Sequence, residues 1–137
     1  MDSELPAQHA SVNEELVQMT RLVGSAMNRA TQALLDADLT LAESVIAADA
    51  LIDTLASDME ERCFDLIAGE RRSAAELPFI IGALRIAASL ERMGDLAEHV
   101  AKQARLRYPR LSIPWSCAGP SRRWVGSPRP SCRRPAR

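Results

Sequence analysis

Apolar residues recur at steps of three and four positions along three long segments of this chain. Such spacing places apolar side chains on one face of a helix. The segments run from Ser11 to Asp36, from Asp38 to Ala68, and from about Ser73 to Tyr108. The links between them are only a few residues long, and short links between long helices favour antiparallel neighbours. The sequence therefore predicts an all-α fold, an elongated antiparallel three-helix bundle.

Two prolines limit the third helix. Pro109 disfavours helical backbone at the residue before it, so the helix is expected to end at Tyr108. Pro78 lacks the N–H that an interior helical residue donates, and it is tolerated only in the first turn. We therefore prefer a helix that starts near Leu77 over one that starts near Ser73 and is kinked at Pro78.

A formal net charge of -1 conceals two regions of opposite character. Residues 1–113 carry all 18 acidic residues and 11 basic ones, whereas residues 114–137 carry six arginines and no acid. Of the 24 tail residues, 17 are Arg, Pro, Ser or Gly, a composition that cannot bury enough apolar surface to fold. We expect one helical domain over residues 8–113 and a disordered tail over 114–137. So abrupt a change suggests translation of a GC-rich gene in a wrong frame, which sequencing the coding DNA would test.

The composition also excludes several classes of protein. No segment approaches the ~20 apolar residues of a membrane-spanning helix, and the acidic start lacks the layout of a signal peptide. Three cysteines cannot form a fully paired disulfide framework. We expect a reduced, cytoplasmic protein without membrane insertion. The tail arginines could contact nucleic acid or an acidic surface, or be inert, and no nucleic-acid partner is expected.

Three carboxylates in the third helix are the strongest candidates for chemistry. At ~100° per residue, Glu91, Asp95 and Glu98 lie within about 60° of one another, on an arc that is apolar earlier in the helix. Carboxylates this close repel one another unless a cation intervenes, and hard cations or iron take oxygen ligands. Gly94, costly inside a helix, indicates the close approach of another helix or a ligand. The sequence predicts weak binding of a divalent metal or iron; the alternative is exposed acids paired with nearby cations such as Lys102.

The other candidates are weaker. His99 lies one turn beyond Asp95 but is more typical of a surface histidine, and His9 has no evident partner. Cys63 lies in the apolar rhythm of the second helix and is expected to be a small core residue. No nucleophile is accompanied by a base, so the chain is not expected to be an enzyme.

The third helix resembles the signature of the PhoU family. Gly82–Ala101 has an apolar lead-in, the motif L-E-R-M-G-D at Leu90–Asp95, and a further turn that ends in Val-Ala. Met27–Glu43 is similar to the turn between the first two helices of that family, and Lys102–Pro109 is closest to actinobacterial members. The resemblance covers about residues 8–113.

This resemblance implies a negative regulator of phosphate uptake and of phosphate-regulon signalling, in intracellular phosphate homeostasis. Family members have two three-helix repeats, are often dimeric, bind metal through E(D)xxxD motifs, and couple a Pst-type transporter ATPase to a PhoR-type sensor kinase. Glu91 and Asp95 match that motif, while Ser89 stands where many relatives have an acid. A homodimer is expected because one copy could substitute for the second repeat.

Only the first repeat of the family pattern is present in this sequence, which leaves other functions open. One alternative is a stand-alone helical binding or scaffold module whose acidic stripe faces cations or basic partners. Another is a truncated product with no function. Adjacent phosphate-transporter or two-component genes would favour regulation over the scaffold.

Overall fold

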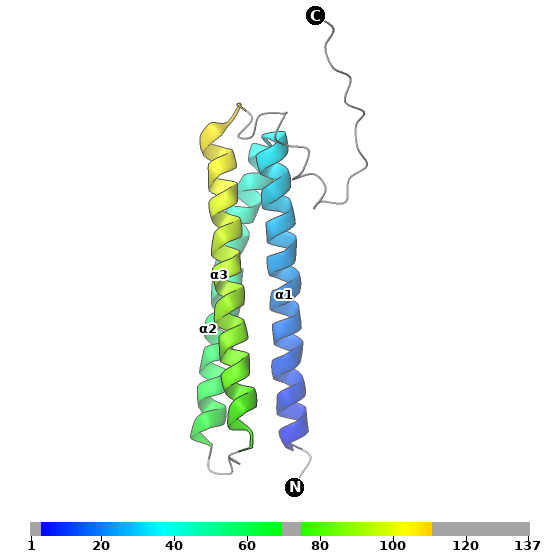
Figure 1. Ribbon diagram of the computed structural model, residues 1–137, viewed down its shortest axis with the longest axis vertical. Helices are drawn as coiled ribbons and strands as arrows, with labels where there is room; N and C mark the ends of the chain where they lie inside the picture. Colours follow the sequence, from blue (N-terminus) through cyan, green and yellow to red (C-terminus); the bar gives the residue numbers. More distant parts are fainter. Residues whose placement is uncertain (1–3, 70–74, 111–137) are drawn as a thin grey trace, which may run out of the picture.

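Three helices lie side by side in the computed structural model, which describes residues 4–69 and 75–110 (Figure 1). Helix α1 spans Glu4–Asp36, α2 spans Leu39–Ala68, and α3 spans Leu77–Arg107. Each is about 45–50 Å long at ~1.5 Å per residue. Helices α1 and α3 run in the same direction, α2 runs in the opposite direction, and each helix packs against both of the others (Figure 1). The predicted elongated, antiparallel three-helix bundle is confirmed.

Some predictions concern residues beyond the described part of the chain. The tail over 114–137, expected to be disordered, lies outside it, as does most of the link after Gly69. The domain limits of 8–113 therefore stay a prediction. Within residues 4–69 and 75–110, none of the helices is both long enough and apolar enough to cross a lipid bilayer.

The helix limits follow from local chemistry and from one tertiary contact. Helix α1 begins at Glu4, earlier than the predicted Ser11. In this extension the ring of His9 packs on that of Phe79 from α3, with centroids 4.1 Å apart. Sequence periodicity gave His9 no partner, because a contact between distant segments leaves no local pattern. Helix α3 begins at Leu77, as preferred, with Pro78 in its first turn.

The turn between α1 and α2 needs only two residues. Ala37 adopts a left-handed backbone with φ of 52°, which reverses the chain. Asp38 then caps α2, because its carboxylate accepts a hydrogen bond of 2.9 Å from the backbone N–H of Leu41. This tight turn places α2 antiparallel to α1.

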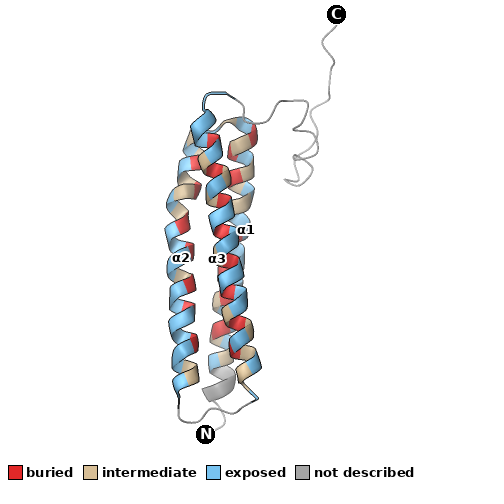
Figure 2. Ribbon diagram, turned by 60° about the vertical axis from the view of Figure 1, so that its left-hand side comes forward, coloured by how far each residue is buried: buried red, intermediate tan, exposed pale blue. Residues whose placement is uncertain are grey.

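Small side chains fill much of the core. Buried residues line the inward faces of all three helices (Figure 2). Ten of the twenty residues in the core cluster are alanines. Cys63 is also fully buried in this cluster, as expected. Because alanine projects little from the backbone, helices lined by it can approach closely. On α3 the alanines nearest the predicted metal residues are Ala97 and Ala101.

Candidate metal centre

One core position of α2 holds an aspartate. Asp49 follows Val45 by one turn and precedes Ile52, both of which are buried. The Asp49 residue is only 9% exposed, and its Oδ1 atom has no hydrogen-bond partner among the described residues. Burial raises the pKa of this carboxyl above its ordinary value, and the negative charges of nearby carboxylates raise it further. A buried carboxylate oxygen that accepts no hydrogen bond is costly and calls for an explanation such as a ligand.

Gly94 lets α3 approach α2 at this level. A Cβ atom added to Gly94 would lie 3.1 Å from Cγ2 of Ile52 and 3.2 Å from Oδ1 of Asp49. The space that a side chain would fill is therefore occupied by two side chains of α2. The prediction that Gly94 marks the close approach of another helix is confirmed.

The close approach gathers carboxylates from both helices. Asp49, Asp53 and Asp95 each offer one oxygen, and the three oxygens lie within 4.8 Å of one another. Asp49 and Asp53 are four residues apart, so they share one face of α2. We call these three residues the carboxylate cluster. Its oxygens suit a hard cation, since carboxylates are the preferred ligands of such ions and of iron.

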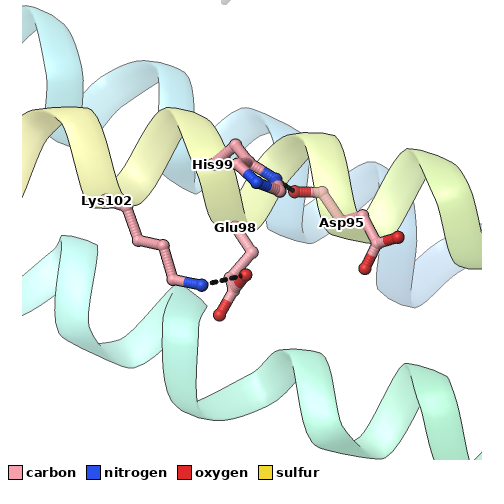
Figure 3. Close-up of polar contacts among 4 residues, drawn as sticks. All are labelled: Asp95, Glu98, His99 and Lys102. Carbon is pink, nitrogen blue, oxygen red and sulfur yellow. Dashed lines mark hydrogen bonds and ion pairs between the residues drawn. The ribbon is translucent and has the colours of Figure 1, made fainter.

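Glu98 points toward α2 beside the cluster but is already paired. Its Oε2 atom lies 2.5 Å from Nζ of Lys102, one turn further along α3. The Glu98 side chain is 16% exposed and that of Lys102 is 39% exposed. Figure 3 shows both side chains on the side of α3 that faces α2, with Asp95 on the same side. The pair matches the alternative in which acids of this helix bind a nearby cation.

Glu91 and His99 lie apart from the cluster. Glu91 lines a depression between α2 and α3, together with Glu60 and Arg85. His99 points away from α2, and its Nδ1–H donates a hydrogen bond of 2.7 Å to the backbone oxygen of Asp95 (Figure 3). The structure therefore brings only Asp95, of the three predicted metal residues, into the cluster.

Sequence reasoning missed Asp49 and Asp53, although a signal for them exists. Asp49 occupies a position at which the three- and four-residue spacing of buried residues along α2 predicts an apolar residue, and Asp53 follows one turn later. A charged residue in a core register is uncommon, because burying a charge is costly. The pattern Asp-x-x-x-Asp on α2 also matches the spacing of Glu91 and Asp95 on α3.

The structure thus places this chain in the class of all-helical bundle proteins, with a cluster of carboxylates between two of its helices. The PhoU domain model matches residues 16–104, which is well over half of the sequence. This chain therefore belongs to the PhoU family.

Curated relatives agree with that assignment. The chain is 47% identical over 107 residues to the phosphate-specific transport system accessory protein PhoU homolog 2 of Mycobacterium bovis, covering 78% of this chain and 50% of the relative. It is 46% identical over 107 residues to homolog 1 of Mycobacterium leprae, covering 78% of this chain and 48% of the relative. It is 43% identical over 91 residues to the homolog of Aquifex aeolicus, covering 66% of this chain and 41% of the relative. The chain thus spans about half the length of the curated relatives it matches, and no solved structure matches it significantly.

Proposed function

We propose that this chain acts as an accessory and regulatory component of phosphate transport, restraining phosphate uptake and phosphate-regulon signalling in the cytoplasm. The observation that carries this proposal is the 47% identity to a mycobacterial phosphate-specific transport system accessory protein. By family resemblance, its partners would be the ATPase of a Pst-type transporter and a PhoR-type sensor kinase.

The role we propose is binding, not catalysis. Ser89 donates a hydrogen bond of 2.7 Å to the backbone oxygen of Arg85, and His99 binds the backbone of Asp95. Cys63 is fully buried, and its burial raises the pKa of the thiol, which keeps it protonated and unreactive. These engaged or buried side chains support a regulatory function over an enzymatic one.

Complementation tests this function. The chain would be expressed in a strain that lacks its own PhoU protein, with a phosphate-regulated reporter as the readout and the full-length Mycobacterium bovis homolog as the positive control. We expect the chain to restore repression of the reporter in high phosphate. Full derepression despite normal amounts of folded chain would contradict the proposal and favour the scaffold or the non-functional product.

We also propose that the carboxylate cluster binds a divalent cation or iron weakly. The support is Asp49, whose buried Oδ1 atom has no partner among the described residues and whose carboxylate offers an oxygen within 4.8 Å of oxygens from Asp53 and Asp95. A bound cation would neutralise charges that otherwise repel, so it would stabilise the fold by mass action. Glu91 and Glu98, the other residues predicted from the sequence, flank Asp95 by about one turn on either side along α3 and are the candidates for further ligands.

Thermal melting tests which carboxylates bind the metal: those of the carboxylate cluster, or those predicted from the sequence on α3. The wild type would be melted with a chelator and then with iron, manganese or magnesium, and we expect a metal-dependent rise in melting temperature. Asp49→Asn together with Asp53→Asn should abolish that rise. Glu91→Gln together with Asp95→Asn should also abolish it, whereas Glu91→Gln alone should reduce it only slightly. A wild type that melts identically in chelator and in every metal would mean that these acids bind no cation.

We further propose that the chain forms a homodimer through apolar side chains of α3. Ile86, Met93 and Leu96 are 45–59% exposed, and in helical projection they lie opposite the carboxylates of the same helix. Exposed apolar side chains that lie together commonly mark association sites. We call these three residues the open flank.

Sedimentation tests the dimer. The wild type should associate as its concentration rises, and Leu96→Glu should shift it toward the monomer. Leu51→Glu is a matched control, because Leu51 on α2 is 50% exposed and lies outside the open flank. A wild type that stays monomeric over a wide range of concentrations would contradict the proposal.

A further inference from the structure

Lys102 is the cation that acts on the carboxylate cluster. Among the described residues, three acids influence the Asp49 carboxyl, namely Asp53, Glu98 and Asp95, and all of them disfavour its ionisation. Lys102 alone acts in the opposite sense on this carboxyl. Its ammonium group is held at this level of the bundle by the ion pair with Glu98, with Nζ and Oε2 2.5 Å apart (Figure 3).

The ion pair has two consequences for a cation that enters the cluster. The positive charge of Lys102 repels an incoming cation, and water screens this repulsion only in part, since the Lys102 side chain is 39% exposed and its partner Glu98 is 16% exposed. In addition, Lys102 holds the Glu98 carboxylate, which is only 16% exposed and points to the same side of α3 as Asp95 (Figure 3). Glu98 is therefore withheld as a further ligand for as long as the pair is closed.

We propose that Lys102 is a tethered counter-cation that sets the metal affinity of the carboxylate cluster, by neutralising it when no metal is bound and by holding Glu98 away from the ligand set. This inference rests on the proposed metal site, and it adds a residue that opposes binding where the others support it. Metal binding then opens the Glu98–Lys102 pair, and the affinity is limited by the competition between metal and ammonium.

The principal test removes the charge but keeps the length of the side chain. Lys102→Met preserves an unbranched, helix-compatible residue. Calorimetric titration with Mn²⁺ should show binding about tenfold tighter than in the wild type, since one nearby positive charge is lost. Melting in chelator should show the opposite effect: the variant melts below the wild type, because its carboxylates have lost their counter-cation. If Lys102 served only surface packing, its replacement by Met would not both tighten Mn²⁺ binding and lower the melting temperature in chelator.

Three further variants separate charge from ligand release. Lys102→Arg keeps the charge and should bind Mn²⁺ as the wild type does. Glu98→Gln frees Lys102 to pair within the cluster, so it should bind more weakly than the wild type. The double variant Lys102→Met with Glu98→Gln should bind less tightly than Lys102→Met alone, and this difference measures the contribution of the released Glu98. Arg21→Met, which removes an exposed positive charge from α1, should leave the affinity unchanged.

The outcomes distinguish the two proposals. If the wild type binds Mn²⁺ and Lys102→Met binds no more tightly, the role of Lys102 is wrong while the metal site stands. If neither protein binds Mn²⁺ although both are fully helical by circular dichroism, the metal site itself is wrong and the inference is overturned with it. Tighter binding in Arg21→Met, equal to that in Lys102→Met, would also overturn the inference, because the effect would then reflect overall charge.

Discussion

Helix α3 has two opposite flanks of different composition. Toward α2 it carries Asp95, which lies against the buried carboxylate of Asp49. On the other side, Met93 and Leu96 of the open flank are 45% and 59% exposed. Charged side chains normally face water while apolar ones are covered, because burying charge costs free energy and burying apolar surface releases it.

This contrast separates the part of α3 that packs in the core from the parts that face outward. The stripe between the two flanks is lined by buried alanines such as Ala97 and Ala101 and packs in the core of the bundle. Buried charges and exposed apolar patches are commonly found where a protein binds something. We propose a cation as the ligand of the carboxylate cluster and a second copy of the chain as the partner of the open flank.

The largest expected effect comes from forcing α2 and α3 apart at Gly94. In Gly94→Val the first added carbon already lies 3.1 Å from Cγ2 of Ile52, so α2 and α3 must move apart at this level. We expect a loss of about 3 kcal/mol in the free energy of unfolding, measured by chemical denaturation. Gly24→Val is the matched control, because a Cβ at Gly24 meets nothing within 4 Å. Equal stability of Gly94→Val and the wild type would mean that the close approach is not needed.

A gain in stability is expected from removing the buried charge of Asp49 on α2, which faces α3. Asp49→Asn should raise the free energy of unfolding by about 1–2 kcal/mol at neutral pH in chelator, because a desolvated carboxylate is replaced by a neutral group of equal size. The same variant should lose stabilisation by metal. A variant less stable than the wild type in chelator would show that the carboxylate is already compensated.

The pH dependence of that gain has a definite sign. Since the folded pKa of Asp49 is raised above its ordinary value of 3.8, the native state keeps this proton to higher pH than the unfolded chain does. Rising pH therefore favours unfolding between the two pKa values. The advantage of Asp49→Asn should be absent below pH 3.8 and should grow as pH rises through the folded pKa. Parallel melts of both proteins across this range isolate Asp49, because the other carboxyls are common to the two.

Much of the fold could be predicted because its signals are local. The apolar rhythm placed all three helices, and Pro78 and Pro109 placed the limits of α3 to within one residue of Leu77 and Arg107. The start of α1 was predicted too late, because its extension is supported by the contact of His9 with Phe79, which is distant in sequence.

The site could be predicted only in part because it is built from two helices. Asp95 was identified from its own helix, and Gly94 correctly indicated a close neighbour. Which residues of α2 face Gly94 depends on the register between antiparallel helices, and spacing within one helix does not fix that register. Asp49 and Asp53 were therefore missed, although an acid in the core rhythm of α2 was visible in the sequence.

The smallest expected effect belongs to Gly24 and Gly82, two glycines that lie inside helices with free space beside them. A Cβ added at Gly24 of α1 or at Gly82 of α3 meets nothing within 4 Å. Gly82→Ala should therefore raise the free energy of unfolding by about 0.5–1 kcal/mol through helix propensity alone, and Gly24→Ala should do the same. This gain contrasts with the loss at Gly94, where the added atom would meet Ile52 and Asp49.

Gly82→Ala also reports on the proposed dimer, because Gly82 lies one turn before Ile86 on the same side of α3. If a second copy packs over Gly82, the gain should be full in dilute solution, and sedimentation of Gly82→Ala should show weaker association than the wild type, whereas Gly24→Ala should associate as the wild type does. Unchanged association together with the full gain would place the dimer surface elsewhere. Absence of the gain in dilute solution would mean that contacts within the bundle already occupy the space above these glycines.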